Sequence, residues 1–246
     1  MKINDILKIL DSIAPFCTAE EWDNSGLLIG DADSEIKKIG IVLDITNETV
    51  DYAINNSIDL IISHHPVIFH PLANIDSSSP VYRMIANGIS AIACHTNFDK
   101  TGRLNKALAE RLDLEYICDI EGGWGIICAL AIETDVEVFA QQVKEKIGAT
   151  GLSYGGNRKI KKIAISTGSA FEDVYSALLQ GADGIITSDV KHNGFIDAVN
   201  MNFSVISADH YDTEKLFCEE LYALLKDTVK DTQLEIITQE SAQKHI

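Results

Sequence analysis

The feature that most constrains the fold of this chain is an internal repeat. Residues 36–65 align without a gap to residues 160–189, at an offset of 124 residues (160 − 36), and both copies begin with the sequence IKKI. Apolar strands are predicted at 38–43 and 60–63, at 162–166 and at 184–188. A helix is predicted between the strands of each copy, beginning near Thr46 in the first and near Ser169 in the second. Ser169 and Glu172 have the spacing of a capping box.

Strands that alternate with helices in this way are typical of a parallel sheet covered by helices on both faces. We therefore predict an α/β protein with two pseudo-symmetric halves, residues 1–125 and 126–246, each a mostly parallel sheet flanked by helices. In such sheets, ligands bind beyond the carboxyl ends of the strands. The polar sequences expected at those ends are HH at 64–65, HTNFD at 95–99, SDVKHN at 188–193 and DHYDTE at 209–214.

Three of these segments, HH, HTNFD and DHYDTE, favour a metal site, although each side chain also has a simpler explanation. His64 and His65 can share one cluster only if the strand ends there and the backbone turns, since neighbours in a strand point to opposite faces; otherwise they are hydrogen-bonded histidines that close a strand. Asp99 could instead cap the helix that follows it. His210 and Glu214 share one face of a helix, where they could bind a metal or each other. The three clusters together favour metal.

Other histidines and one aspartate have less certain roles. His95 and His192 are candidates for proton transfer, because the pKa of imidazole lies near neutral pH, and His192 could equally be structural. Asp44 ends the first strand of the repeat, where it could orient a ligand or begin the next helix. We expect His70 to be exposed, and we exclude His245 because it lies in the terminal segment.

Composition narrows the class of partner. Lys plus Arg number 20 against 37 Asp plus Glu, which gives a net charge of −17 and argues against binding to nucleic acid. Bound divalent cations could reverse this field locally for an anionic substrate. The five cysteines form no CxxC motif and are expected to be free thiols, so we predict a cytoplasmic protein. No stretch approaches 18 consecutive apolar residues, so we predict no membrane span.

The sequences ISHHPVIF, HTNFD and HYDTE, together with EEWDNSGLLIG near the start, resemble the Nif-three-like family, also called GTP cyclohydrolase 1 type 2 homologs. The chain resembles the short form, which lacks the inserted middle domain. The resemblance implies a dinuclear metal site in the cleft between the two α/β halves, a toroidal homohexamer, and a role near the site for Asn24 and its turn. It implies a ligand set consisting of His64, His65, Asp99, His210 and Glu214. The chain departs from the family pattern at Asp209, where glycine is usual, and at His192-Asn193, where a histidine pair is common.

The resemblance further implies a metal-dependent hydrolase that acts on a small molecule, with GTP as the favoured substrate. A metal-bound hydroxide would open the purine imidazole ring and release formate. The ligand types fit two divalent ions per subunit without choosing among Zn, Mn, Fe, Co and Ni, and Asp99 or Glu214 could bridge them. Two alternatives stay open: a dinuclear metallohydrolase acting on another phosphorylated metabolite, and a non-catalytic metal-binding or regulatory assembly.

Overall fold

The computed structural model describes residues 1–245 and divides the chain into two compact units. The first unit comprises Met1–Thr101 and Phe217–Glu240, and the second comprises Gly102–Leu216 together with the residues from Ser241 on. The division expected between residues 125 and 126 therefore differs from these units. The reason is that the segment after residue 216 contributes a helix and a strand to the first unit rather than to the second.

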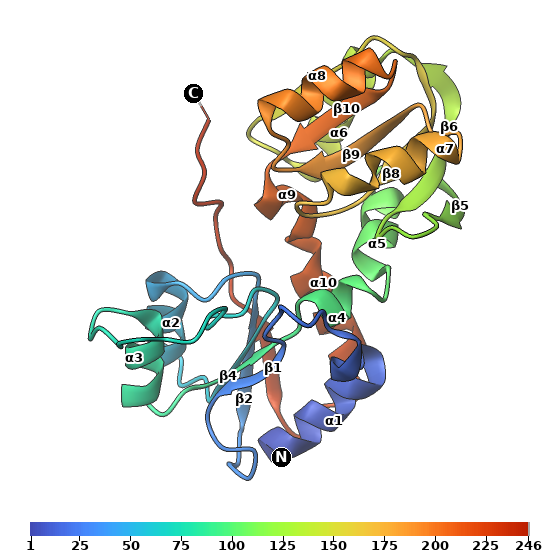
Figure 1. The fold of residues 1–246 in the computed structure, drawn as a ribbon. Helices are drawn as coiled ribbons and strands as arrows, with labels where there is room; N and C mark the ends of the chain where they lie inside the picture. Colours follow the sequence, from blue (N-terminus) through green and yellow to red (C-terminus); the bar gives the residue numbers. More distant parts are fainter. Residues whose placement is uncertain (246) are drawn as a thin grey trace. The chain divides into compact units, whose positions relative to one another are not determined.

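The first unit is built on a five-stranded sheet with the order β1-β4-β3-β2-β11 (Figure 1). Its elements in chain order are α1 (Ile3–Ile13), the short helix η1 (Phe16–Thr18), β1 (Gly26–Ile29), β2 (Lys38–Val42), α2 (Asn47–Asn55), β3 (Leu60–Ser63), α3 (Pro80–Ala86), β4 (Ser90–Ala93), α4 (Thr96–Asp99), α10 (Leu216–Leu225) and β11 (Gln233–Ile236). β2, β3, β4 and β11 run parallel, and β1 is antiparallel to β4.

The central strands of the first sheet are buried along almost their whole length. Val42, Ile61 and Ala91 pack with α2 and α3 in one hydrophobic cluster, whereas α1 lies on the other side of the sheet (Figure 1). All four residues of β3 are buried, because helices cover both faces. The strand therefore ends abruptly where polar residues begin, which is where the histidine pair stands.

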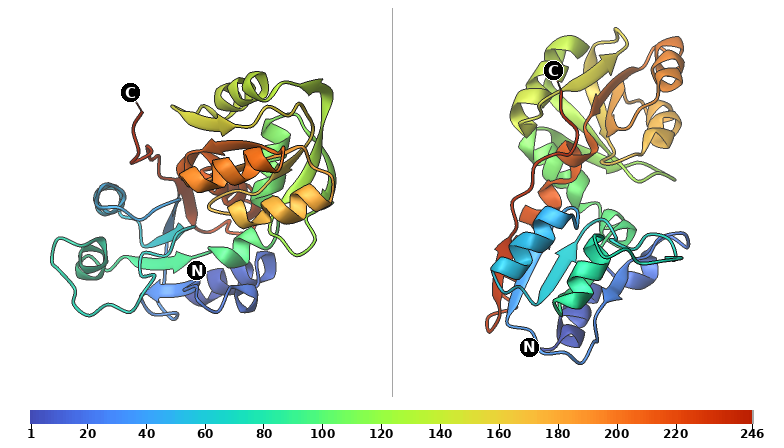
Figure 2. Two further views of the ribbon diagram at one scale, coloured as in Figure 1. Left: turned by 45° about the horizontal axis from the view of Figure 1, so that its top comes forward. Right: turned by 90° about the vertical axis from the view of Figure 1, so that its left-hand side faces the viewer.

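The second unit is built on a six-stranded sheet with the order β5-β6-β8-β9-β10-β7. Its elements in chain order are α5 (Arg103–Arg111), β5 (Glu115–Asp119), β6 (Ile126–Thr134), α6 (Val136–Ile147), β7 (Leu152–Gly155), β8 (Ile160–Ile165), η2 (Phe171–Asp173), α7 (Val174–Leu179), β9 (Gly184–Ser188), α8 (His192–Asn200), β10 (Ser204–Ala208) and α9 (His210–Glu214). α7 and α8 cover one face and α6 the other (Figure 2).

The α/β class and the two helix-flanked sheets are confirmed, with a difference in the second sheet. β8, β9 and β10 are parallel as expected. Within residues 1–245, however, β5, β6 and β7 join this sheet through antiparallel pairings. These strands lie outside the repeated segment, so the repeat contained no information about them. Within the same residues, no helix combines the length and the apolar character needed to cross a bilayer.

The repeat is visible in the structure as a shared backbone anchor. One carboxylate oxygen of Asp59 accepts hydrogen bonds from the amides of Lys37 and Lys38. Asp183, at the offset of 124 residues, does the same for the two equivalent lysine amides. The predicted capping box at Ser169 is not formed, because the chain there makes the short helix η2, and α7 begins only at Val174.

Candidate metal centre

His64 and His65 come close together because the backbone turns directly after β3. The hydroxyl of Ser63, the last residue of β3, donates a hydrogen bond of 2.8 Å to the carbonyl of His65. The two imidazole centroids lie 5.0 Å apart. The turn that the sequence required for a shared cluster is therefore present.

His95 and Asp99 approach this pair from the segment after β4. The His95 ring centroid lies 5.3 Å from that of His64 and 5.6 Å from that of His65. One ring nitrogen from each of the three histidines lies within 4.8 Å of the others, so the three could hold a metal ion. Asp99 ends α4, with its Oδ1 3.4 Å from His64 Nε2. It does not cap the next helix, since Gly102 occupies the N-cap of α5.

Each imidazole of this three-histidine cluster is held through its Nδ1 atom. His64 Nδ1 lies 2.8 Å from the carbonyl oxygen of Cys94. His65 Nδ1 lies 2.7 Å from Asp44 Oδ1. His95 Nδ1 lies 2.8 Å from Asp23 Oδ1. An oxygen acceptor at Nδ1 selects the tautomer that carries its proton there and places the lone pair on Nε2, which is the usual arrangement for histidine ligands of metals.

Asp23 is the most firmly held of these carboxylates. Its Oδ2 accepts hydrogen bonds from the hydroxyls of Ser25 and Thr96 and from the Thr96 amide. Burial alone would raise the pKa of Asp23, but the hydrogen bonds from His95, Thr96 and Ser25 outweigh it and hold the pKa well below its usual value. Asp23 is therefore a permanent anion behind His95, and it fixes the orientation of that ring.

The donor set of the first unit fits a cation. With its proton on Nδ1, His64 turns a lone pair on Nε2 toward the Asp99 carboxylate at 3.4 Å. Two electron-pair donors that face each other repel unless a proton or a metal ion lies between them. The distance also matches the span of about 3.4 Å between two ligands of one tetrahedral ion with bonds of about 2.1 Å.

The second unit contributes a histidine and a glutamate one helical turn apart. His210 and Glu214 begin and end α9, with His210 Nε2 2.8 Å from Glu214 Oε2. His210 Nδ1 lies 2.6 Å from Asp189 Oδ2. A neutral imidazole has one proton and can donate to only one of these carboxylates. The arrangement therefore fits either an imidazolium or a cation shared with the glutamate.

The buried carboxylate of Glu214 occupies space left by a glycine. Gly168 has a φ of +70°, and a Cβ atom built there would lie 2.2 Å from Glu214 Oε1. Gly168 is the repeat equivalent of Asp44 at the offset of 124 residues. The second copy therefore has no side chain at the position where the first copy has the aspartate that holds His65.

Most of the predicted site residues lie close to other predicted site residues of the same unit. His64, His65, His95 and Asp99 cluster in the first unit, and His210 contacts Glu214 in the second. His192 is the exposed first residue of α8.

Three aspartates hold imidazoles of the candidate site by their Nδ1 atoms: Asp44 holds His65, Asp23 holds His95, and Asp189 holds His210. Asp44 had an ambiguous role in the sequence, whereas Asp23 and Asp189 were assigned none. The sequence indicated Asp23 and Asp189 only by their place inside the motifs WDNS and SDVKHN.

Comparison with known proteins identifies the family. The chain matches Duf34/NIF3 (NGG1p interacting factor 3) over residues 1–244. The chain belongs to the Duf34/NIF3 family. One relative, from Clostridium perfringens, is named GTP cyclohydrolase 1 type 2 homolog; it is 32% identical over 98% of this chain and 97% of its own length. Another, from Helicobacter pylori strain J99, is named GTP cyclohydrolase 1 type 2; it is 35% identical over 87% of this chain and 88% of its own length.

A solved structure agrees with the fold. Staphylococcus aureus protein SA1388 superposes with a TM-score of 0.92 at 28% identity, over 100% of this chain and 99% of that one. The Duf34/NIF3 fold therefore extends along the whole described chain. The match includes every segment that carries a candidate ligand.

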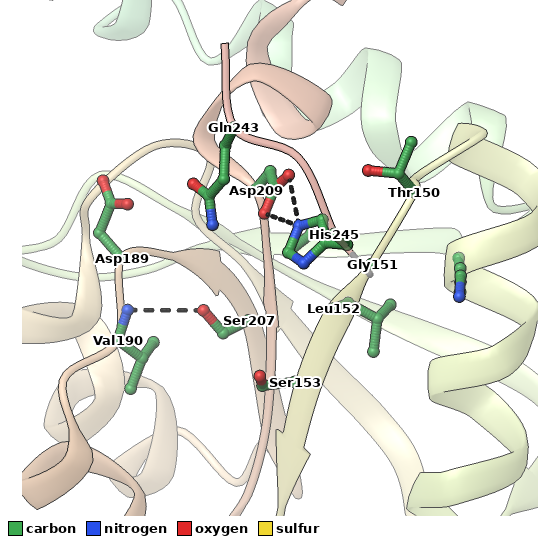
Figure 3. A pocket seen from close by; sticks show the side chains of 12 residues that line it. Thr150, Gly151, Leu152, Ser153, Asp189, Val190, Ser207, Asp209, Gln243 and His245 are labelled. Carbon is green, nitrogen blue, oxygen red and sulfur yellow. Dashed lines mark hydrogen bonds and ion pairs between the residues drawn. The ribbon is translucent and has the colours of Figure 1, made fainter. Parts of the chain in front are cut away.

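The departure from the Duf34/NIF3 pattern at Asp209 has a partner in the structure (Figure 3). His245 Nε2 lies 2.9 and 2.8 Å from the two carboxylate oxygens of Asp209. The ring packs on Gly151, where a Cβ atom would lie 2.5 Å from it. His245, which the sequence gave no reason to include, therefore lines a polar cavity of about 420 Å³ together with Asp189, the residue that holds His210.

A second cavity opens beside the histidine cluster of the first unit. It has a volume of about 440 Å³, and Asp44 and His65 lie at its wall. The remaining wall is largely aliphatic, including Val67, Leu72 and Ile75. A volume of this size suits a small-molecule ligand.

Proposed function

We propose that this Duf34/NIF3 protein is a metal-dependent hydrolase of the GTP cyclohydrolase type 2 kind. His64, His65 and Asp99 of the first unit and His210 and Glu214 of the second would hold two divalent ions. The observation that supports this most strongly is the shared anchoring of these imidazoles through Nδ1, which leaves Nε2 of each ring as the atom that would bind metal. The names of the relatives favour GTP as substrate.

Bound divalent ions would supply water with a pKa lowered toward neutrality. The residues of the chain have separate tasks. Asp44, Asp189 and the Cys94 carbonyl fix the tautomers of the ligand imidazoles. Asp23 orients His95, which we assign to proton transfer, and we assign the same task to His192 at the start of α8. The cavity beside His65 offers room for part of a small substrate.

The assembly and the cellular location are also proposals. We propose a homohexamer, which light scattering on the purified protein would test. We propose a cytoplasmic location, in keeping with five cysteines that are all free thiols. Neither bears on the chemistry of the site.

The function is tested by measuring two quantities on one preparation, the metal content per chain and the formate released from GTP. We expect stoichiometric metal and formate release in the unaltered protein. His64→Ala should lose both, because it removes a buried ligand, whereas the exposed His70→Ala should keep both.

The two readouts separate the ways in which the proposal could be wrong. Turnover in metal-free His64→Ala would overturn the metal-dependent chemistry. Bound metal without formate release would overturn GTP ring opening, and release of inorganic phosphate from a phosphorylated metabolite would then identify a phosphoester hydrolase.

A further inference from the structure

Two aromatic side chains lie exposed beside the three-histidine cluster. The side chains of Trp22 and Phe69 are 57% and 38% exposed. Their ring centroids are 6.0 Å apart with an interplanar angle of 49°. Each also lies 6.2 Å from the His95 ring, with its plane nearly perpendicular to the imidazole. Large exposed aromatic rings that gather at a polar cluster are typical of binding surfaces.

The backbone that carries these two rings is tied to the cluster. Asn24 Nδ2 donates a hydrogen bond of 2.5 Å to the carbonyl of Ile68, which joins the turn after Trp22 to the loop before Phe69. Asp23, between Trp22 and Asn24, holds the His95 ring. The two rings are therefore attached on both sides to residues that anchor the site, and a ligand would find them already positioned.

The surroundings favour a planar ring over a phosphate group as the part that is recognised here. Lys100, at the end of α4, forms an ion pair of 2.7 Å with Glu20, which offsets its charge. Among the described residues, the wall of the cavity beside His65 contains no Trp, Tyr or Phe, and it includes the carboxylates of Asp44 and Asp76. Stacking on aromatic rings needs no charge, and it strengthens the binding of every nucleobase.

We propose that Trp22 and Phe69 form a stacking surface for the planar heterocyclic ring of the substrate, next to the three-histidine cluster. The inference rests on the proposed function only in taking a purine as that ring. It makes Trp22 and Phe69 residues of substrate binding, with no part in holding metal. It also gives each residue of the WDNS turn a separate task, since Ser25 supports Asp23.

Tryptophan fluorescence tests the surface directly, because the chain has two tryptophans, Trp22 and Trp124. Trp124→Phe leaves Trp22 as the reporter, and Trp22→Phe leaves Trp124 in the second unit as the matched control. We expect guanosine, which has the ring and no phosphate, to quench Trp22 saturably. Ribose 5-phosphate, which has no ring, should leave it unchanged. Quenching of both reporters to the same extent, or of neither, would overturn the stacking surface.

Affinity provides a second readout on the metal-containing protein. Trp22→Ala and Phe69→Ala should each weaken guanosine binding at least about fivefold, with metal content unchanged. Tyr82→Ala removes an exposed ring elsewhere in the first unit and should leave binding unchanged. Unaltered guanosine affinity in Trp22→Ala and Phe69→Ala would overturn the proposal. Circular dichroism of each variant checks that it remains folded.

The outcomes separate this inference from the proposed function. If guanosine stacks on Trp22 but no formate appears from GTP, the surface stands and the cyclohydrolase activity falls. If formate is released while Trp22→Ala binds guanosine normally, the activity stands and the surface falls. If either alanine variant elutes as a smaller species without a loss of guanosine affinity, the rings form a contact between copies of the chain, and the proposal is wrong.

Discussion

The two copies of the repeat keep the same framework but carry different chemistry. Asp59 and Asp183 anchor the start of their sheets through identical pairs of backbone amides. At the site, the first copy ends its strands with Asp44 and His65, which bond to each other. The second copy has Gly168 and Asp189 at these positions. The Asp189 carboxylate holds His210, which belongs to the later helix α9.

This difference shows how a duplicated fold can diverge. Both units have the anchors, in which one carboxylate satisfies two backbone amides. The side chains at the strand ends differ between the copies, so the shared framework does not fix the chemistry at the site. His65 stands at the strand end in the first copy. Asp189 stands at the equivalent position in the second copy, where it holds the imidazole of His210.

The largest effect is expected from the position where the copies differ most. Gly168→Ala adds a methyl group where the Glu214 carboxylate lies and should displace that side chain. Gly181→Ala is a matched control, since its φ of +83° imposes a similar backbone cost of about 1–2 kcal/mol with nothing within 4 Å of the new Cβ atom. We expect Gly168→Ala to weaken metal binding by more than about 100-fold, which exceeds the effect of removing a residue that only supports a ligand. Chelator competition measures this, and equal affinities in the two variants would show that Glu214 is not a ligand.

The next effect compares the two aspartates that hold imidazoles. Asp44→Ala and Asp189→Ala should each lower metal affinity by about 10- to 100-fold, because each removes the acceptor that fixes a ligand tautomer. Asp33→Ala, which removes a surface carboxylate paired with Lys2, should have no effect. The same chelator competition applies. A loss in one aspartate variant alone would mean that only one copy contributes to metal binding.

The shared anchors should act on stability within their own unit. Asp59→Ala and Asp183→Ala each remove a charged acceptor from two amides and should lower the free energy of unfolding by about 1.5–3 kcal/mol. Hydrogen exchange resolves where the loss occurs. Asp59→Ala should expose the amides of Lys37 and Lys38, and Asp183→Ala those of Lys161 and Lys162. If either variant speeds exchange in the unit that does not contain the substitution, the two anchors are not equivalent.

The smallest effect concerns one buried thiol in each unit. Burial raises the pKa of Cys218 in the first unit and of Cys128 in the second to about 12. The unfolded thiols ionise near pH 8.5, so between about pH 8.5 and 12 each lowers the free energy of unfolding by about 1.4 kcal/mol per pH unit. Denaturant titrations from pH 7 to pH 10 measure the slope. Replacing either cysteine by alanine should remove the contribution of that thiol to the slope of the free energy of unfolding against pH. An unchanged slope would contradict the burial of that thiol.

Much of the fold followed from the repeat. β3 and β9 have the predicted bounds, because an uninterrupted apolar run between polar residues leaves few alternatives. The return of α10 and β11 to the first unit was not predictable, since nothing in the repeat corresponds to them. The helix expected to begin near Ser169 begins later, at Val174. The short helix η2 forms at 171–173 in place of the predicted capping box. Asp173, the N-cap residue of α7, makes no side-chain capping bond and instead accepts hydrogen bonds from the amides of Trp124 and Gly125.

The candidate site was easier to predict than its support. The candidate ligands are histidines and carboxylates grouped in short motifs, which a sequence displays directly. The partner of an imidazole depends on which segments meet in space, and Asp23 lies 72 residues from His95 along the chain. The pairing of His245 with Asp209 was invisible for the same reason.

The position of β11 has a consequence for biosynthesis. This strand pairs with β2 through residues 233–236, whereas β2 itself leaves the ribosome almost 200 residues earlier. Domains commonly fold in the order in which they emerge, but here the sheet of the second unit is complete at β10, before the first sheet has received its edge strand. The nascent chain therefore carries an unpaired β2 edge during most of its translation. The first sheet is therefore expected to be completed after the second, when β11 pairs with β2.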